Sequence, residues 1–251
     1  MFDPSALTRD GFLGGALQIW QPIKGYRAAM DPVFLAASVP AKAGQSVLEL
    51  GCGTGVASLC LAKRVVGLSS YGVERQADYA VLARQNAFEN SLNFTVETAN
   101  LQVMPRSLCH SFDHVIFNPP YFLPQSGTQA KDQGRDGALR EETPSKDWID
   151  AATRRLKPGG WLHLIQSAER LPDILAALDT RVGAISVLPL APRAGRAAKR
   201  FILRAQKGAR RPFLLLASFV IHDGASHLAD RSDYSPKAEA ILRNGAALSF
   251  D

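Results

Sequence analysis

The sequence predicts an α/β fold, in which a mostly parallel sheet carries helices on both faces. Short apolar runs that suit buried strands alternate with stretches whose apolar residues recur at helical spacing. A glycine-rich turn, residues 51–55, joins one such strand to a helix. The chain has 251 residues, of which 46% are hydrophobic, so it can bury one large core.

A hairpin and a helix come first. Gly14-Gly15 stands between two short apolar runs, as the turn of a hairpin does. Asp31-Pro32 predicts a helix start with Asp31 as the N-cap, and Pro40 ends that helix. Strands and helices then alternate. We expect strands at 46–50, 71–74, 94–98, 114–117, 161–166, 184–190, 200–204 and 213–221, and helices at 56–64, 76–90, 144–156, 171–178 and from 235 onward.

Four local features complete this outline. Residues 122–143 form a polar segment of a length that is usually functional or disordered. Lys157-Pro158-Gly159-Gly160 predicts a turn before the fifth strand, and residues 235–248 are expected to lie on the surface. The buried side of helix 76–90 is expected to hold Ala77, Ala80, Val81, Ala87 and Phe88.

Composition excludes several classes of protein. No run approaches the roughly 18 apolar residues of a membrane span, and the first ten residues lack a basic-then-apolar secretory pattern. The three cysteines, Cys52, Cys60 and Cys109, form no metal-binding or disulfide pattern, so we expect free thiols, no metal and a cytoplasmic protein. The net charge of +6 favours a polyanionic partner.

The glycine-rich turn predicts a nucleoside cofactor. Its glycines let the backbone approach a ligand closely, and the N–H groups at the start of the next helix face that ligand. The pattern G-x-G-x-G follows Glu49, whose carboxylate would repel a pyrophosphate and attract the ammonium group of a methionine moiety. Glu74 ends the next strand, where an acid can bind ribose hydroxyls. This pattern favours S-adenosylmethionine over a dinucleotide.

The turn Asn118-Pro119-Pro120-Tyr121 directly follows the strand expected at residues 114–117. Two prolines fix two φ angles and remove two donors, so we expect a stiff turn whose carbonyls lack local partners. Together with the Asn118 side chain, these acceptors could hold both N–H bonds of a planar amine and aim its lone pair at a methyl donor. Tyr121 offers a face on which a substrate ring can stack.

These motifs carry a family resemblance. Residues 49–55 resemble motif I of class I methyltransferases, and residues 118–121 resemble motif IV of those that modify adenine N6 or a glutamine amide. Residues 157–160 are similar to the turn before the fifth strand of these enzymes. Residues 21–37 and 138–142 are similar to segments of the bacterial tRNA(Val) adenine-N6 methyltransferase family. The resemblance extends from about Gly11 to Ile221.

The resemblance implies a Rossmann-like class I methyltransferase fold, with a seven-stranded, mostly parallel sheet whose last strand is antiparallel. It implies that residues 1–40 form a hairpin and helix over the cofactor site, and that residues 41–251 form the methyltransferase domain with basic C-terminal strands. Asn118, Pro119 and Tyr121 would be the catalytic residues. The implied cofactor is S-adenosyl-L-methionine, and its expected contacts are Arg27 and Asp31 over the methionine end, with Glu49, Gly51, Gly53, Glu74, Asn100 and Asn118.

A basic stretch indicates the substrate. Residues 191–211 hold eight Lys or Arg and no acid, and we expect Arg193, Arg196, Lys199 and Arg200 to contact RNA phosphates. A target base must leave its stack, which single-stranded loops allow more readily than duplexes. The sequence thus predicts N6-methylation of an adenine in tRNA or other structured RNA.

Three alternatives stay open. A protein glutamine N5-methyltransferase would use the same turn, but such enzymes usually carry a helical N-terminal domain and only residues 1–40 precede the methyltransferase domain here. A non-catalytic RNA-binding module would not need an intact glycine loop. A nicotinamide-dependent oxidoreductase is disfavoured by Glu49 and by the missing third-glycine spacing.

Overall fold

The computed structural model describes residues 2–120, 143–224, 226 and 233–250. Its strands are β1 (Leu7–Phe12), β2 (Leu17–Pro22), β3 (Ser46–Leu50), β4 (Ser69–Glu74), β5 (Phe94–Thr98), β6 (Phe112–Phe117), β7 (Leu156–Ser167), β8 (Val182–Ala191), β9 (Arg200–Lys207), β10 (Leu214–Leu215) and β11 (Phe219–Val220). Its α-helices are α1 (Asp31–Ser38), α2 (Val56–Arg64), α3 (Ala77–Glu89), α5 (Ser145–Arg155), α6 (Leu171–Ala177) and α7 (Pro236–Asn244). Short 3-10 helices are η1 (Pro4–Ala6), η2 (Leu13–Gly15), η3 (Arg106–Leu108) and η4 (Ala168–Arg170).

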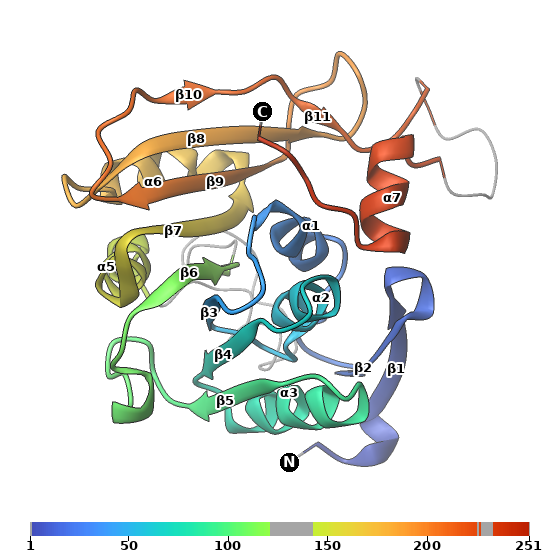
Figure 1. Ribbon diagram of the computed structural model, residues 1–251. Helices are drawn as coiled ribbons and strands as arrows, with labels where there is room; N and C mark the ends of the chain where they lie inside the picture. The colour runs from blue at the N-terminus through green and yellow to red at the C-terminus, as the bar shows by residue number, and fades with distance from the viewer. Residues whose placement is uncertain (1, 121–142, 225, 227–232, 251) are drawn as a thin grey trace.

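Within the described residues, nine strands form one sheet and β1 and β2 form a separate antiparallel hairpin (Figure 1). The order in the large sheet is β10-β8-β9-β7-β6-β3-β4-β5, with β11 also paired to β8. Strand β9 is antiparallel to β7 and β8, whereas the other neighbours are parallel. The predicted α/β fold is confirmed, and β10 and β11 bring the sheet to nine strands where the resemblance implied seven.

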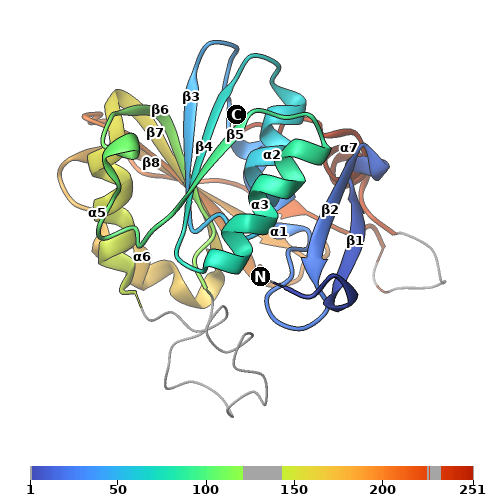
Figure 2. The ribbon, with the colours of Figure 1, turned by 90° about the horizontal axis from the view of Figure 1, so that it is seen from below.

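Helices cover both faces of the sheet. Figure 2 shows α1, α2 and α3 with the hairpin on one side and α5 and α6 on the other. The buried apolar side chains accordingly form two clusters, one on each side. No helix in the described ranges has the length and apolar character needed to cross a membrane.

The predicted elements differ from the observed ones mainly at their ends. Strands β3 and β5 and helix α2 have the expected bounds, whereas Asp31 is the first helical residue and Met30 takes the N-cap position. The expected strand 213–221 is divided into β10 and β11 because its pairing with β8 loses register. From Leu214 to Phe219 the chain advances five residues, while its partners advance only four, from Ser186 to Leu190.

The predicted turn at residues 157–160 is a bulge within β7. Leu156 already pairs with Phe112 of β6, and the register resumes at Trp161 opposite His114, so the extra residues are accommodated between them. Gly159 has a φ of +77° there, a backbone conformation that glycine adopts without strain.

The C-terminal tail is more buried than we expected. Ile241 of α7, Leu248 and Phe250 are each less than 10% exposed and belong to the core on the α1 side. The guanidinium of Arg204 lies 4.3 Å from the centre of the Phe250 ring. Burial of these three apolar side chains holds the tail against the core instead of leaving it on the surface.

Candidate functional site

The motif residues converge at one edge of the sheet. Strands β3, β4 and β6 are parallel neighbours, so their carboxyl ends lie side by side. The glycine loop follows β3, Glu74 ends β4, and Asn118 follows β6. The structure therefore brings together the groups that the sequence assigned to a cofactor and to a target nitrogen.

The glycine loop cannot accept side chains at two of its positions. Gly51 has a φ of +63°, and a Cβ there would lie 2.7 Å from Cη2 of Trp148. Gly55 has a φ of +88° and precedes α2, and a Cβ there would lie 2.9 Å from Cε1 of Phe94. Both glycines are thus required by backbone conformation and by close packing.

Glu74 fastens the loop to β4. Its Oε2 accepts a hydrogen bond from the amide of Gly53 at 2.9 Å, and its Oε1 accepts one from the amide of Gln76 at 2.8 Å. Burial raises the pKa of this carboxyl although both amides stabilise its ionised form. Each carboxylate oxygen retains a lone pair, so the side chain can still accept hydrogen bonds from ribose hydroxyls.

Glu49 is the second buried acid beside the loop. Its Oε2 accepts hydrogen bonds from the amide of Ser58 at 3.0 Å and from the hydroxyl of Ser58 at 2.6 Å. Burial, with a smaller contribution from Glu74, raises the pKa of the Glu49 carboxyl to about 8. A cation beside Glu49 would restore its ionised form, whereas a pyrophosphate would be repelled. The site thus fits S-adenosylmethionine, which is cationic at its ammonium and sulfonium groups.

Tyr26 is a site residue that sequence reasoning missed. A Cβ on Gly53 would lie 3.5 Å from Cε1 of Tyr26, so the ring lies against the glycine loop. The hydroxyl of Tyr79 in α3 donates to the carbonyl of Tyr26 at 3.2 Å and fixes this segment. An aromatic residue between Gly25 and Arg27 was visible in the sequence, but nothing there indicated that it contacts the loop.

The two predicted contacts that follow Tyr26, Arg27 and Asp31, have partners within the protein. Arg27 donates to Asp10 Oδ2 at 2.6 Å and to Thr8 Oγ1 at 2.8 Å, so it ties its segment to β1. Asp31 accepts a hydrogen bond from Nε of Arg200 at 3.2 Å. Both side chains thereby help to hold the segment between β2 and α1.

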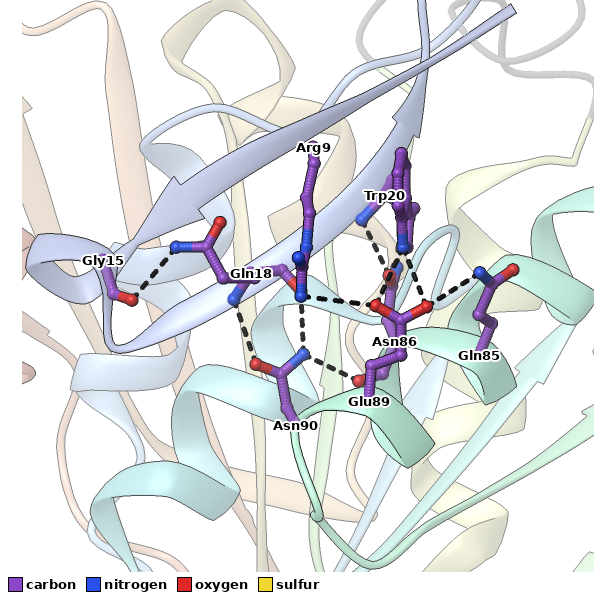
Figure 3. Close-up of polar contacts among 8 residues, drawn as sticks. All are labelled: Arg9, Gly15, Gln18, Trp20, Gln85, Asn86, Glu89 and Asn90. Atoms are coloured by element: carbon purple, nitrogen blue, oxygen red, sulfur yellow. Dashed lines mark hydrogen bonds and ion pairs between the residues drawn. The ribbon is translucent and has the colours of Figure 1, made fainter. Parts of the chain in front are cut away.

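Asn86 of α3 and Asn90, the C-cap residue of that helix, dock the hairpin (Figure 3). The side chain of Asn90 accepts a hydrogen bond from the backbone N–H of Gln18 at 3.0 Å and donates one to the backbone carbonyl of Gln18 at 2.8 Å. Asn86 does the same for Trp20, at 2.7 and 3.2 Å, so the two side chains pair with β2 as a neighbouring strand would. Asn86 also donates to the carbonyl of Thr54 at 3.0 Å and therefore joins the hairpin to the glycine loop.

This docking explains a wrong prediction about α3. Phe88, which we expected on the buried side, is 85% exposed and Ala77 is exposed as well, whereas Asn86 is fully buried. Apolar spacing could not identify Asn86 as a buried residue because its burial depends on backbone groups of a distant strand. Glu89, next to Phe88, accepts hydrogen bonds from the Trp20 indole at 2.9 Å and pairs with Arg9 at 3.4 Å.

The turn after β6 departs from expectation in one respect. The carbonyls of Pro119 and Pro120 have a partner from a distant part of the sequence, because Nε2 of Gln166 donates to them at 3.2 and 3.3 Å. Oδ1 of Asn118 is buried and has no hydrogen-bond partner among the described residues. An acceptor in this state is costly unless a ligand donates to it. Tyr121 and residues 138–142 lie outside the described residues.

The basic segment joins the end of β8 to the start of β9. Strand β9 is antiparallel to both β7 and β8, so β8 runs in the same direction as β7 and β6. The segment therefore lies at the edge of the sheet where β6 ends and Asn118 follows. Arg196 and Lys199 are exposed. Arg193 is only 14% exposed; it pairs with Asp233 and donates to the carbonyls of Asp223 and Gly224. The four predicted phosphate contacts thus divide into two exposed residues and two, Arg193 and Arg200, with acidic partners.

The remaining predicted groups are simpler. Asn100 is exposed and its Oδ1 accepts from the amide of Gln102 at 2.9 Å. Cys52, Cys60 and Cys109 are free thiols, of which the first two are buried and Cys109 is exposed. No cluster of metal-binding side chains occurs in the portions of the chain that the structure describes.

Comparison with known proteins agrees with this geometry. The family model "Methyltransferase small domain" matches residues 30–188. A tRNA1(Val) (adenine(37)-N6)-methyltransferase of Porphyromonas gingivalis is 34% identical over 156 residues, which span 60% of this chain and 58% of that protein. An enzyme of the same name from Aeromonas hydrophila is 28% identical over 210 residues, or 82% of this chain and 86% of its own length.

Other matches fix the fold and retain one alternative. A release factor glutamine methyltransferase of Aliivibrio fischeri is 30% identical over 144 residues, which cover 51% of this chain and 48% of that protein. The crystal structure of a predicted O-methyltransferase from Agrobacterium tumefaciens has a TM-score of 0.71 and 26% identity, and the match covers 87% of this chain and 98% of that one. With its glycine loop, two buried acids and Asn-Pro-Pro turn, the chain belongs to the methyltransferase small domain family and is an S-adenosyl-L-methionine-dependent methyltransferase.

Proposed function

We propose that this enzyme methylates N6 of an adenine in tRNA. The observation that carries the proposal is Oδ1 of Asn118 at the end of β6, which is buried and has no hydrogen-bond partner in the described part of the chain. It is an acceptor beside the glycine loop, where the methyl donor binds. A primary amine on an aromatic ring supplies the donor that this oxygen lacks.

The chain's own groups supply orientation. Asn118 Oδ1 accepts one N–H of the amine, and a prolyl carbonyl accepts the other through the lone pair that Gln166 leaves unused. This grip favours the geometry in which the nitrogen lone pair points at the methyl group. S-adenosylmethionine supplies that group, and the new N–C bond forms as the C–S bond breaks with its electrons left on sulfur. The methylated nitrogen then loses its proton to water, so no strong base is needed.

Two observations favour tRNA over protein. Two relatives named as tRNA1(Val) adenine-N6 methyltransferases match 82% and 87% of this chain, whereas the glutamine methyltransferase matches 51%. Arg196 and Lys199 are exposed at the same edge as Asn118, where they would meet RNA phosphates.

The proposed cofactor contacts are Arg27, Asp31, Glu49, Gly51, Gly53, Glu74 and Asn100. Tyr121 is proposed as the residue on which the adenine stacks.

The direct test is to identify the methylated product. The purified protein is incubated with labelled S-adenosylmethionine and bulk tRNA from a strain in which its gene is deleted, and the tRNA is digested to nucleosides. We expect label in N6-methyladenosine and far less of it with the Asn118→Ala variant. Label in a release factor would replace this proposal with the glutamine alternative, and label in a ribose O-methyl nucleoside would point to O-methylation.

A further inference from the structure

Gln166 is the side chain that holds the Asn-Pro-Pro turn. It lies near the end of β7 and is 1% exposed. Leu164 pairs with Phe117 of β6, so Gln166, two residues further on, lies level with the prolines that follow β6. Its Nε2 donates to the carbonyl of Pro119 at 3.2 Å and to that of Pro120 at 3.3 Å.

The orientation of this amide is determined by its surroundings. Oε1 accepts a hydrogen bond from the amide of Ser167 at 2.7 Å, and Nε2 uses its two hydrogens for the two prolyl carbonyls. A flipped amide would place Oε1 against two carbonyl oxygens and leave the Ser167 amide without its acceptor. Both Nε2 hydrogens are therefore used by the turn, and the side chain is almost completely buried.

The turn needs such an external donor. Pro119 and Pro120 have no N–H groups, so neither residue can donate a backbone hydrogen bond to fix the turn. The proline rings fix both φ angles, and Pro120 also restricts ψ of Pro119, but no ring fixes ψ of Pro120, which determines where its carbonyl points. A buried donor that reaches both carbonyls removes this freedom. Asn118 comes directly before them, and its buried Oδ1 has no partner within residues 2–120, 143–224, 226 and 233–250.

We propose that Gln166 is a positioning residue for methyl transfer: it holds the Pro119 and Pro120 carbonyls in the orientation that lets the turn and Asn118 grip the target amine. This inference rests on the proposed N-methylation. Gln166 acts through the turn and does not touch the reacting atoms. Its removal should lower the rate of the chemical step and leave cofactor and RNA binding nearly unchanged.

The first test is Gln166→Met, which keeps the length of the side chain without its amide. Single-turnover rates are measured with bulk tRNA from the deletion strain, alongside the KM for tRNA and the Kd for S-adenosylmethionine. We expect the rate to fall roughly 10–100-fold, because small misplacement of reacting groups has effects of this size, while KM and Kd change less than about twofold. The control is Gln206→Met in β9, since Gln206 donates to the carbonyl of Gly159 at 2.8 Å away from the turn.

The second test is Gln166→Glu, which separates positioning from a general loss of structure. A protonated glutamic acid can donate to one prolyl carbonyl, whereas the ionised form repels both, and burial raises the pKa of such a group. The variant should therefore regain activity as the pH falls, a dependence that the wild type and Gln206→Met lack. A Gln166→Met rate within twofold of wild type, or a Gln166→Glu rate without this recovery, would overturn the inference. A wild-type enzyme that forms no N6-methyladenosine would instead overturn the proposed function.

Discussion

The guanidinium of Arg200 donates a hydrogen bond from Nε to Oδ2 of Asp31, over 3.2 Å. The pair joins the first residue of β9 to the first residue of α1 and brings together two positions 169 residues apart in the chain. Asp31 was expected over the cofactor and Arg200 against RNA. The ion pair neutralises much of the charge that Arg200 could offer to a phosphate. The basic segment therefore has to be tested residue by residue.

Arg196 and Lys199 should carry the RNA affinity of this segment. Both are exposed at the edge of the sheet where Asn118 lies. Replacing both with alanine should reduce the slope of log affinity against log salt by roughly 1–2 units, because each phosphate contact releases about one counterion. Filter binding of tRNA at several salt concentrations measures this slope. An unchanged slope would place the RNA surface elsewhere.

Arg193 should affect stability more than RNA binding. Its side chain is 14% exposed, pairs with Asp233 and donates to two backbone carbonyls. Arg193→Ala removes these contacts and leaves Asp233 less well paired, which should lower the free energy of unfolding by about 2 kcal/mol and the melting temperature by roughly 4–8 °C. Thermal unfolding monitored by circular dichroism tests this, with Arg196→Ala as the exposed control. Equal effects of the two substitutions would contradict the structural role of Arg193.

Asn118→Ala should remove most turnover and leave cofactor binding nearly intact. Its Oδ1 acts on the target nitrogen, and the structure gives it no partner among the described residues, so little stability is lost with it. The rate should fall roughly 100–1000-fold, the range seen when one aimed hydrogen-bonding group is removed from an active site. Calorimetric titration with S-adenosylmethionine provides the binding arm. If Asn118→Ala weakened S-adenosylmethionine binding as much as it slowed methylation, Asn118 would act mainly as a cofactor contact.

Asn86→Ala and Asn90→Ala form a matched pair. Each removes two hydrogen bonds between α3 and the backbone of β2, but only Asn86 also donates to the carbonyl of Thr54 in the glycine loop. We expect Asn86→Ala to weaken binding of S-adenosylmethionine about tenfold, since one hydrogen bond contributes on the order of 1 kcal/mol. Asn90→Ala should change it less than about twofold. Equal losses would mean that the hairpin, and not the link to the loop, determines cofactor affinity.

Local sequence predicted the parts of the site that depend on neighbouring residues. The bounds of β3, the glycine loop and the Asn-Pro-Pro turn follow from apolar runs and from residues with special backbone preferences. Gln166 could not be found in this way because its partners lie 46 and 47 residues earlier in the chain, and a glutamine in a strand carries no local signal of burial. Asn86 and Arg200 are similar cases, since each is defined by a contact with a distant segment.

The buried histidines should make the protein sensitive to acid. Nδ1 of His114 lies 3.4 Å from Nε2 of His163, and burial lowers the pKa of His114 to about 4 and that of His163 as well. An unfolded chain protonates these rings below about pH 6.5, so the folded state loses relative stability as the pH falls from 6.5 toward 4. Each ring contributes up to about 1.4 kcal/mol per pH unit in this window. Urea unfolding of the wild type and of His163→Gln should show a shallower acid slope in the variant.

Glu49 should show the opposite dependence on pH and a conflict between stability and cofactor binding. The pKa of its carboxyl is raised to about 8 in the folded protein, against an ordinary value of 4.5, so the folded state binds more protons between these limits. The contribution of Glu49 is therefore most favourable below pH 4.5 and is lost as the pH rises through 8. Glu49→Gln should stabilise the cofactor-free protein near pH 9 by on the order of 2 kcal/mol, or roughly 4–8 °C in melting temperature.

The same substitution should weaken S-adenosylmethionine binding, because the neutral amide no longer attracts the ammonium group. In the wild type, binding near pH 7 should release a proton as Glu49 ionises beside that cation. Calorimetric titration in two buffers with different ionisation enthalpies measures this proton, and Glu49→Gln is the control that should lack it. If the wild type released no proton while Glu49→Gln bound the cofactor as tightly, Glu49 would hold the loop through Ser58 alone and the ammonium would find its acceptor elsewhere.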